Sequence, residues 1–252
     1  MKQTITNRPL VFAHRGAKRV APENTLPAFE AAIRLGADGV ELDVQYSSDG
    51  KLVIFHDLNL EKTSNGTGRL TAHTFEELRR LDAGSYFSPD FAGTQIPTPD
   101  EVLDLAKGKL LVNIELKSLE ISGAKLGVDV VQTVRAHGMV DDVVISSFNP
   151  FVLRRSKLAG PEIEHALLLD LDTQGWTRWG LTLRHSHADG VHPETRMADA
   201  AYVAAAHKRK MPVRVWTVND EGEMRRLAAL EVDAIISDIP DVALRALQGS
   251  AS

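Results

Sequence analysis

The stretch Gly39-Val40-Glu41-Leu42-Asp43-Val44 alternates apolar residues with carboxylates at every second position. In a β-strand, residues i and i+2 point to the same side, so Glu41 and Asp43 would share one face. Seven more short runs rich in β-branched residues occur along the chain, and helical stretches separate them. The strands are predicted at about 10–13, 39–44, 109–115, 142–146, 163–168, 188–191, 212–216 and 233–237. A βα unit repeated eight times indicates an α/β protein with a parallel sheet.

The helices between these strands have recognisable start signals. Thr98-Pro99-Asp100-Glu101 reads as a capping box with proline in the first helical position. Thr25-Leu26-Pro27 opens another helix in the same way. The weakest periodicity lies in 172–187, where we expect a short helix or a loop.

The gap between the second and third predicted strands is longer than the others. Asp49-Gly50 is a hairpin signal, and an extra strand is expected over 51–55. Turn residues then dominate about 57–98, with one short helix at 74–81. We interpret 57–98 as a small insertion on the rim of the sheet, within a single domain that spans 1–252.

Composition excludes several classes of protein. The 252 residues are 43% hydrophobic and carry a net charge of −5, which disfavours nucleic acid as a partner. The chain has no cysteine, so disulfides, thiolate metal sites and cysteine nucleophiles are excluded. No apolar run is long enough for a membrane span. The N-terminal residues lack an apolar signal core, so we expect a cytoplasmic protein.

Carboxylates gather near the ends of the second and third predicted strands. Glu41 and Asp43 share a face of one strand, and Glu115 and Lys117 have the same spacing on the next. Carboxylates this close would repel one another unless a cation lay between them. Oxygen ligands without cysteine suit Ca²⁺ or Mg²⁺. The alternative is that the carboxylates are exposed edge charges, or that they form salt bridges with Lys117.

Other strand ends carry residues suited to phosphate chemistry. His14 and Arg15 end the first strand, and arginine binds phosphate oxygens through two parallel hydrogen bonds. His56 lies beside Asp57 after the extra strand, in a pair that could equally be part of a structural turn. Trp216 could form the wall for a glycerol or alcohol group, or be a packed aromatic residue.

Several motifs follow one another in order between about residues 10 and 240. They are His14-Arg15-Gly16, Pro22-Glu23-Asn24-Thr25, Glu41-Leu42-Asp43-Val44, His56-Asp57, Thr63-Ser64-Asn65-Gly66, Ile96-Pro97-Thr98-Pro99, Asn113-Ile114-Glu115-Leu116-Lys117, Ser147-Phe148, Trp216-Thr217-Val218-Asn219 and Ile236-Ser237-Asp238. The series resembles the glycerophosphodiester phosphodiesterase family of the bacterial cytoplasmic type. The resemblance implies a TIM (β/α)8 barrel with a small insertion between the second and third barrel strands.

The resemblance also implies a chemistry. Its substrate would be a small glycerophosphodiester, cleaved to sn-glycerol 3-phosphate and an alcohol. Glu41, Asp43 and Glu115 would hold a divalent cation, either Ca²⁺ or Mg²⁺. His14 and His56 would act as the acid and base, and Arg15 and Lys117 would bind the phosphate.

Other functions stay open at this stage. A lysophospholipase D-like enzyme, or a phosphodiesterase or lyase that forms a cyclic phosphate, would use the same barrel. A binding protein on a catalytically inactive barrel would lack one or more of the histidines and carboxylates of the site. All five are present, namely His14, Glu41, Asp43, His56 and Glu115. An isomerase or aldolase using Lys117 as a Schiff base is disfavoured, because nearby carboxylates would keep that lysine protonated. The oligomeric state is open, with a homodimer as one option.

Overall fold

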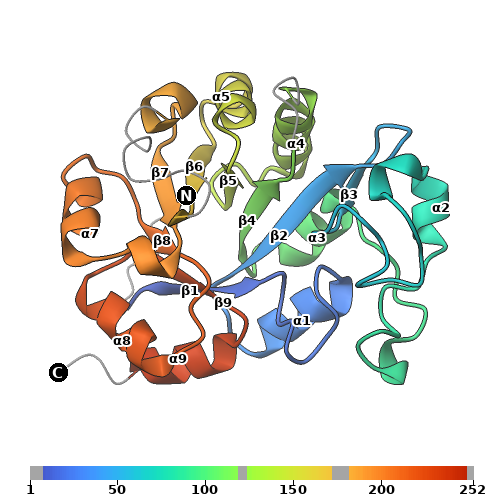
Figure 1. Ribbon diagram of the computed structural model, residues 1–252, viewed down its shortest axis with the longest axis horizontal. Helices are drawn as coiled ribbons and strands as arrows, with labels where there is room; N and C mark the ends of the chain where they lie inside the picture. Colours follow the sequence, from blue (N-terminus) through green and yellow to red (C-terminus); the bar gives the residue numbers. More distant parts are fainter. Residues whose placement is uncertain (1–7, 119–123, 172–181, 249–252) are drawn as a thin grey trace.

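The computed structural model describes residues 8–118, 124–171 and 182–248. Its strands form a ring with helices around the outside (Figure 1). The eight parallel strands are β1 (Leu10–His14), β2 (Gly39–Tyr46), β4 (Leu111–Leu116), β5 (Val143–Ser147), β6 (Glu164–Leu169), β7 (Gly190–Pro193), β8 (Arg214–Val215) and β9 (Ala234–Ser237). They lie in the order β7-β6-β5-β4-β2-β1-β9-β8, and a parallel bridge between Val191 and Val213 joins the two ends. The predicted barrel is confirmed.

Helices alternate with the strands and cover the outer face of the barrel. They are α1 (Leu26–Arg34), α3 (Pro99–Ala106), α4 (Ala124–His137), α5 (Pro150–Ala159), α7 (Ala200–His207), α8 (Glu221–Ala229) and α9 (Pro240–Gln248). The capping box predicted at Thr98 is present, with Glu101 as its partner. In the stretch 172–187, residues 182–186 are helical, and 172–181 lie outside the described residues.

Two large apolar clusters lie mainly between the helices and the outward-facing strand residues. One is built around β2, β4 and β5 with α1, α3 and α4, and the other around β7, β8 and β9 with α7, α8 and α9. A smaller cluster, which includes Phe12 and Ile236, lies on β1 and β9. Because both faces of the strands are covered, most of their residues are buried, as parallel strands require.

The chain between β2 and α3 departs from the regular alternation. Strand β3 (Leu52–Ile54) pairs antiparallel with β2, as the hairpin signal predicted. Short elements follow, namely η1 (Leu70–Ala72), α2 (Phe75–Arg79) and η2 (Pro89–Phe91). Leu60, Leu70 and Leu78 pack with β3 side chains in a separate small core. Because this small core includes side chains of β3, it attaches the segment to the barrel.

The barrel is what positions the candidate site. All eight of its strands run in one direction, so their carboxyl ends lie at the same end of the barrel, where active sites of this fold are found. Within the described ranges, the structure has no helix long and apolar enough to cross a membrane.

Candidate active site

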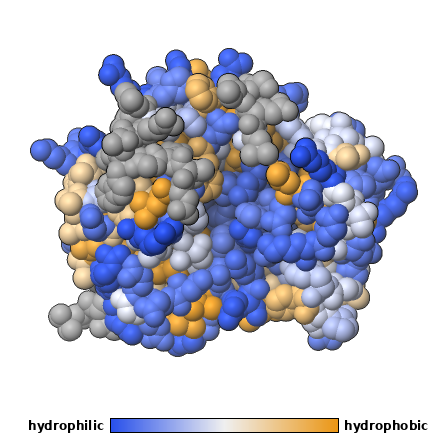
Figure 2. All heavy atoms as spheres, in the orientation of Figure 1, coloured by the Kyte–Doolittle hydropathy of each residue, from blue (hydrophilic) through white to orange (hydrophobic). Residues whose placement is uncertain are grey.

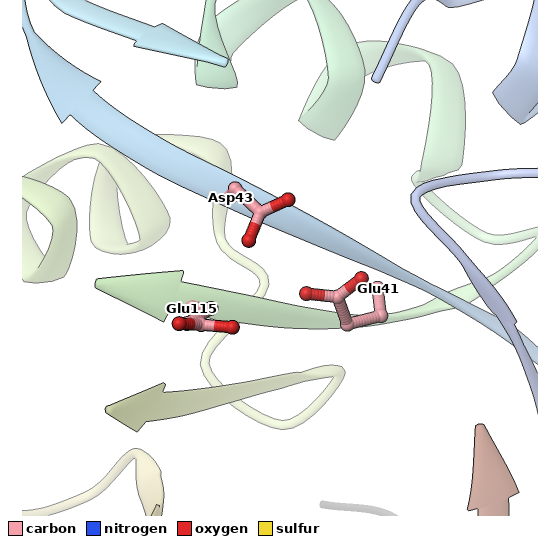
Figure 3. Close-up of side chains that lie close together, drawn as sticks. All are labelled: Glu41, Asp43 and Glu115. Carbon is pink, nitrogen blue, oxygen red and sulfur yellow. The ribbon is translucent and has the colours of Figure 1, made fainter. Parts of the chain in front are cut away.

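Three carboxylates meet at the carboxyl end of neighbouring strands (Figure 3). Glu41 and Asp43 project from β2, and Glu115 projects from β4. Asp43 and Glu115 are register partners on these two strands, which brings the three carboxylates together. One oxygen from each lies within 4.8 Å of the others, and all three side chains are buried. They are therefore not exposed edge charges.

Crowding of buried negative charge changes the acidity of this cluster. Burial raises the pKa of Glu41 well above its ordinary value, and the charges of Asp43 and Glu115 raise it further. Burial likewise raises the pKa of Glu115 to about 7, although Lys117 opposes the shift. Such a cluster is stabilised by positive charge placed between its oxygens, so these residues fit a hard divalent cation.

Two cationic side chains compensate part of this charge. Lys117 lies with its Nζ 2.6 Å from Glu115 and 3.2 Å from Asp43, and the Arg15 Nε lies 3.4 Å from Asp43. Burial alone would raise the pKa of Asp43, but Lys117 and Arg15 hold it well below its ordinary value. The salt bridges to Lys117 are present, yet three carboxylates still face two cations.

The loop after β1 is shaped around these carboxylates. The backbone N–H of Arg15 donates to Glu41 at 3.0 Å, and Asn24 donates its side-chain N–H to Asp43 at 2.8 Å. Both Arg15 and Asn24 have φ of 56°, in the left-handed region. The Arg15 guanidinium also donates to Glu23 at 2.9 Å. The motif around 22–25 thus orients both the arginine and a carboxylate.

His14 is held by a carboxylate on another strand end. Its Nδ1 lies 2.6 Å from Asp238, which also contacts Lys18 at 2.9 Å. Because a carboxylate accepts hydrogen bonds, Nδ1 carries a proton there and Nε2 is left without one in the neutral ring. That Nε2 lies 3.9 Å from Glu41. Burial lowers the pKa of His14 although Asp238 opposes the shift, so the ring is neutral near pH 7.

His56 has a similar arrangement on the far side of the carboxylates. Its Nδ1 lies 2.6 Å from Asp57, and burial lowers its pKa although Asp43 opposes the shift. The buried side chain of Gln45 donates to the carbonyl oxygens of Phe55, His56 and Asp57 at 2.8–3.1 Å. Gln45 thereby fixes the backbone that carries His56.

These groups border one cavity of about 240 Å³. The eight residues predicted for the site are its neighbours: seven line it directly, and Asp43 lies behind them in contact with Arg15 and Lys117. Trp216 lines the cavity and also packs edge-on against Phe148, with ring centroids 5.5 Å apart. On the face shown in Figure 2, hydrophilic residues gather around the middle of the molecule.

Sequence reasoning assigned no role to four residues that the structure places here. Asn24, Asn113 and Asp238 occur within the motifs without an assigned function, and Gln45 lies outside all of them. Gln45 continues the every-second-residue spacing of Glu41 and Asp43, which is a signal that could have found it. Asn113 pairs in register with Glu41 and lines the cavity.

Comparisons with known proteins agree with this geometry. Residues 14–242 match the Glycerophosphoryl diester phosphodiesterase family. The chain belongs to this family. It is an enzyme, a glycerophosphodiester phosphodiesterase, and its family resemblance predicted from the motifs is confirmed.

Individual relatives cover nearly the whole chain. A glycerophosphodiester phosphodiesterase of Caldanaerobacter subterraneus is 38% identical, over 93% of this chain and 96% of its own. One from Bacillus altitudinis is 36% identical, again over 93% and 96%. A phosphodiesterase of Oleispira antarctica, solved with its product sn-glycerol-3-phosphate, is 32% identical with a TM-score of 0.88. That match covers 95% of this chain and 96% of the other.

Proposed function

We propose that this enzyme hydrolyses glycerophosphodiesters to sn-glycerol 3-phosphate and an alcohol, with help from a divalent cation. The observation that carries the proposal is the joint lining of one cavity by carboxylates, two cationic side chains and two histidines. The Oleispira relative with bound sn-glycerol-3-phosphate supports the identity of the product.

Glu41, Asp43 and Glu115 would hold the cation, and Ca²⁺ or Mg²⁺ suits their all-oxygen donor set. When bound, the cation would neutralise negative charge on the phosphate and make its phosphorus more electrophilic. The raised pKa values of Glu41 and Glu115 support this role: burial disfavours their charged forms, neighbouring carboxylates disfavour them further, and a bound cation would favour them.

Arg15 and Lys117 would bind the phosphate oxygens. Both side chains line the cavity and both are held in place by carboxylates, Arg15 by Glu23 and Lys117 by Glu115. Cationic donors fixed before the substrate arrives stabilise charge on phosphorus without having to reorganise during the reaction. Trp216 would form an apolar wall beside the glycerol moiety.

The two histidines would move the protons. His14 would take the proton of the attacking hydroxyl group, because the bond from Nδ1 to Asp238 leaves Nε2 without a proton in the neutral form that burial favours. His56 would be the acid: in its charged form, which burial opposes but Asp43 and Asp57 favour, its Nε2 would protonate the departing alkoxide. Each histidine would act through the nitrogen that its carboxylate partner leaves exposed to the substrate.

A coupled assay for released glycerol 3-phosphate tests the proposal. The enzyme is first treated with a chelator and then assayed on deacylated phospholipid head-group diesters, with and without added Ca²⁺ or Mg²⁺. We expect turnover only with the cation, and a chelated protein that stays folded at the assay temperature. Full activity after chelation would refute the role of the cation. Absence of glycerol 3-phosphate with every diester would refute the function.

The cytoplasmic location and the single-domain organisation with an insertion at 57–98 stay predictions from the sequence.

A further inference from the structure

A second hollow, of about 320 Å³, opens beside the cavity described above. His56, Glu115, Lys117 and Phe148 border both spaces. His14, Arg15 and Glu41 line only the first, whereas Asp57 and Leu58 line only the second. The two spaces therefore meet at the cationic and acidic side chains where a phosphate would bind.

A phosphodiester has two arms on one phosphorus, and the site has two spaces at one phosphate position. If His56 protonates the departing alcohol, that alcohol must lie next to His56, which the second hollow allows. The glycerol arm would then lie in the first cavity, beside His14 and Trp216. This assignment rests on the proposed function and adds to it the position and chemistry of the variable arm.

Several polar side chains that border the second hollow are already engaged with other protein groups, as Asp57 is with His56 at 2.6 Å and with Lys62 at 3.2 Å. Ser147 donates to the Leu116 carbonyl at 3.0 Å and accepts from the Asn149 N–H. The Asn149 side chain caps α5 through its oxygen and donates its N–H to the Ser118 carbonyl. Leu58, Leu116 and Phe148 supply apolar surface.

A polyol placed in this hollow would lose water without finding partners for all its hydroxyls, which is unfavourable. A methylated or aliphatic alcohol has fewer hydroxyls to leave without partners and gains apolar contact. Where that alcohol carries an ammonium charge, the carboxylate of Asp57 in the lining offsets the cost of removing the charge from water.

We propose that the second hollow is the subsite for the leaving alcohol, and that it takes a carbon-rich alcohol such as choline in preference to a polyol. Leu58 is the residue through which this preference can be changed. It is 47% exposed at the edge of the hollow, so a polar replacement should not disturb folding. It is also next to Asp57 but makes none of the contacts that hold the carboxylate cluster.

The experiment compares glycerophosphocholine with glycerophosphoglycerol, whose leaving alcohols differ while the glycerol 3-phosphate arm is shared. For the unmodified enzyme we expect kcat/KM to favour the choline diester about fivefold. This is the factor that corresponds to the free-energy cost of leaving one hydroxyl without a hydrogen-bond partner. Leu58→Asp should raise that ratio about two- to fivefold, and Leu58→Arg should lower it by a similar factor, as expected for an exposed charge near the ammonium group. Leu158→Asp is the matched control, because Leu158 is an exposed leucine on α5 that does not line the hollow.

The outcomes are distinct. Opposite shifts of the ratio in the two Leu58 variants, with none in the control, support the proposal. An unchanged ratio, with KM altered equally for both diesters, would place the shared glycerol arm in this hollow and overturn it. A preference for glycerophosphoglycerol in the unmodified enzyme would overturn the choice of a carbon-rich alcohol. Failure to release glycerol 3-phosphate from either diester would instead refute the proposed function.

Discussion

Two groups of buried charges occupy the two ends of the barrel, and they are built in opposite ways. Near the start of the strands, Arg214 on β8 lies 2.7 Å from Glu164 on β6, one cation against one anion. Gly190 on β7 lies between them: a Cβ there would come within 3.5 Å of both side chains. At the carboxyl ends, three carboxylates share only Arg15 and Lys117.

The difference shows what each group does. A balanced ion pair is complete within the protein, and removing either partner leaves an uncompensated charge. The carboxylate cluster is incomplete: burial is the main cause of its raised pKa values, neighbouring carboxylates raise them further, and an added cation would oppose both effects. The pair near the strand starts is therefore suited to stabilising the fold, whereas the cluster at the strand ends is suited to binding a cation, at a cost in stability.

The largest expected effect is on catalysis at the carboxyl end. His14→Ala and His56→Ala should each lower kcat by about 10²–10⁴-fold, the usual range for losing a general acid or base. Thermal unfolding should change little, because both residues lie at strand ends. The half-buried His207 on α7, which contacts Asp233, supplies the control variant His207→Ala, which should retain full activity. A His56→Ala enzyme with normal kcat would return His56 and Asp57 to a purely structural turn.

At the opposite end, Arg214→Met should lower the free energy of unfolding by about 3–5 kcal/mol, because the largely buried carboxylate of Glu164 loses the cation that lies 2.7 Å from it. Urea denaturation measures this effect. Adding Glu164→Gln should recover much of the loss, and calorimetric titration with Ca²⁺ should give the same affinity as for the unmodified protein. The contrast between the two ends fails if Arg214→Met weakens cation binding as much as a change within the cluster does.

Glu115→Gln should have the opposite effect on stability to Arg214→Met. Removing a carboxylate should weaken cation affinity about tenfold or more, yet stabilise the cation-free protein at pH 7. The folded-state pKa of Glu115, about 7, lies above its ordinary 4.5. Its contribution to stability is therefore present below pH 4.5 and is lost as pH rises toward 7.

Urea denaturation of cation-free protein between pH 4.5 and 7 checks this sign. The unmodified chain should lose stability relative to Glu115→Gln as pH rises. Glu164→Gln is the matched control, because it removes a carboxylate paired with Arg214 and should destabilise at pH 7. Equal destabilisation by both substitutions would contradict the distinction between the two ends.

The smallest effect is expected at Gln45, a positioning residue. Gln45→Leu removes the N–H groups that hold three consecutive carbonyls around His56, so His56 should shift slightly. We expect kcat to fall about tenfold, with little change in KM or in Ca²⁺ affinity. If KM rises and cation affinity falls as kcat falls, Gln45 supports the whole site rather than His56.

Much of the fold could be predicted from local patterns. Apolar runs of strand length separated by capped helices predict a parallel α/β sheet, because both signals depend on residues close together in the chain. The extra strand and its hairpin followed from Asp49-Gly50 in the same way. The two-residue spacing of Glu41 and Asp43 was also enough to place both side chains on one face of β2.

The sequence by itself thus determined the strand and helix pattern, the pairing of carboxylates along one strand and, through its ordered motifs, the family. Only the tertiary structure decided which distant residues meet. Asp238 reaches His14 across 224 positions because β9 pairs with β1, and Gln45 reaches the backbone of His56 because β3 folds back on β2. Barrel closure and strand register set these contacts, and neither can be predicted from the spacing of residues close together in the chain.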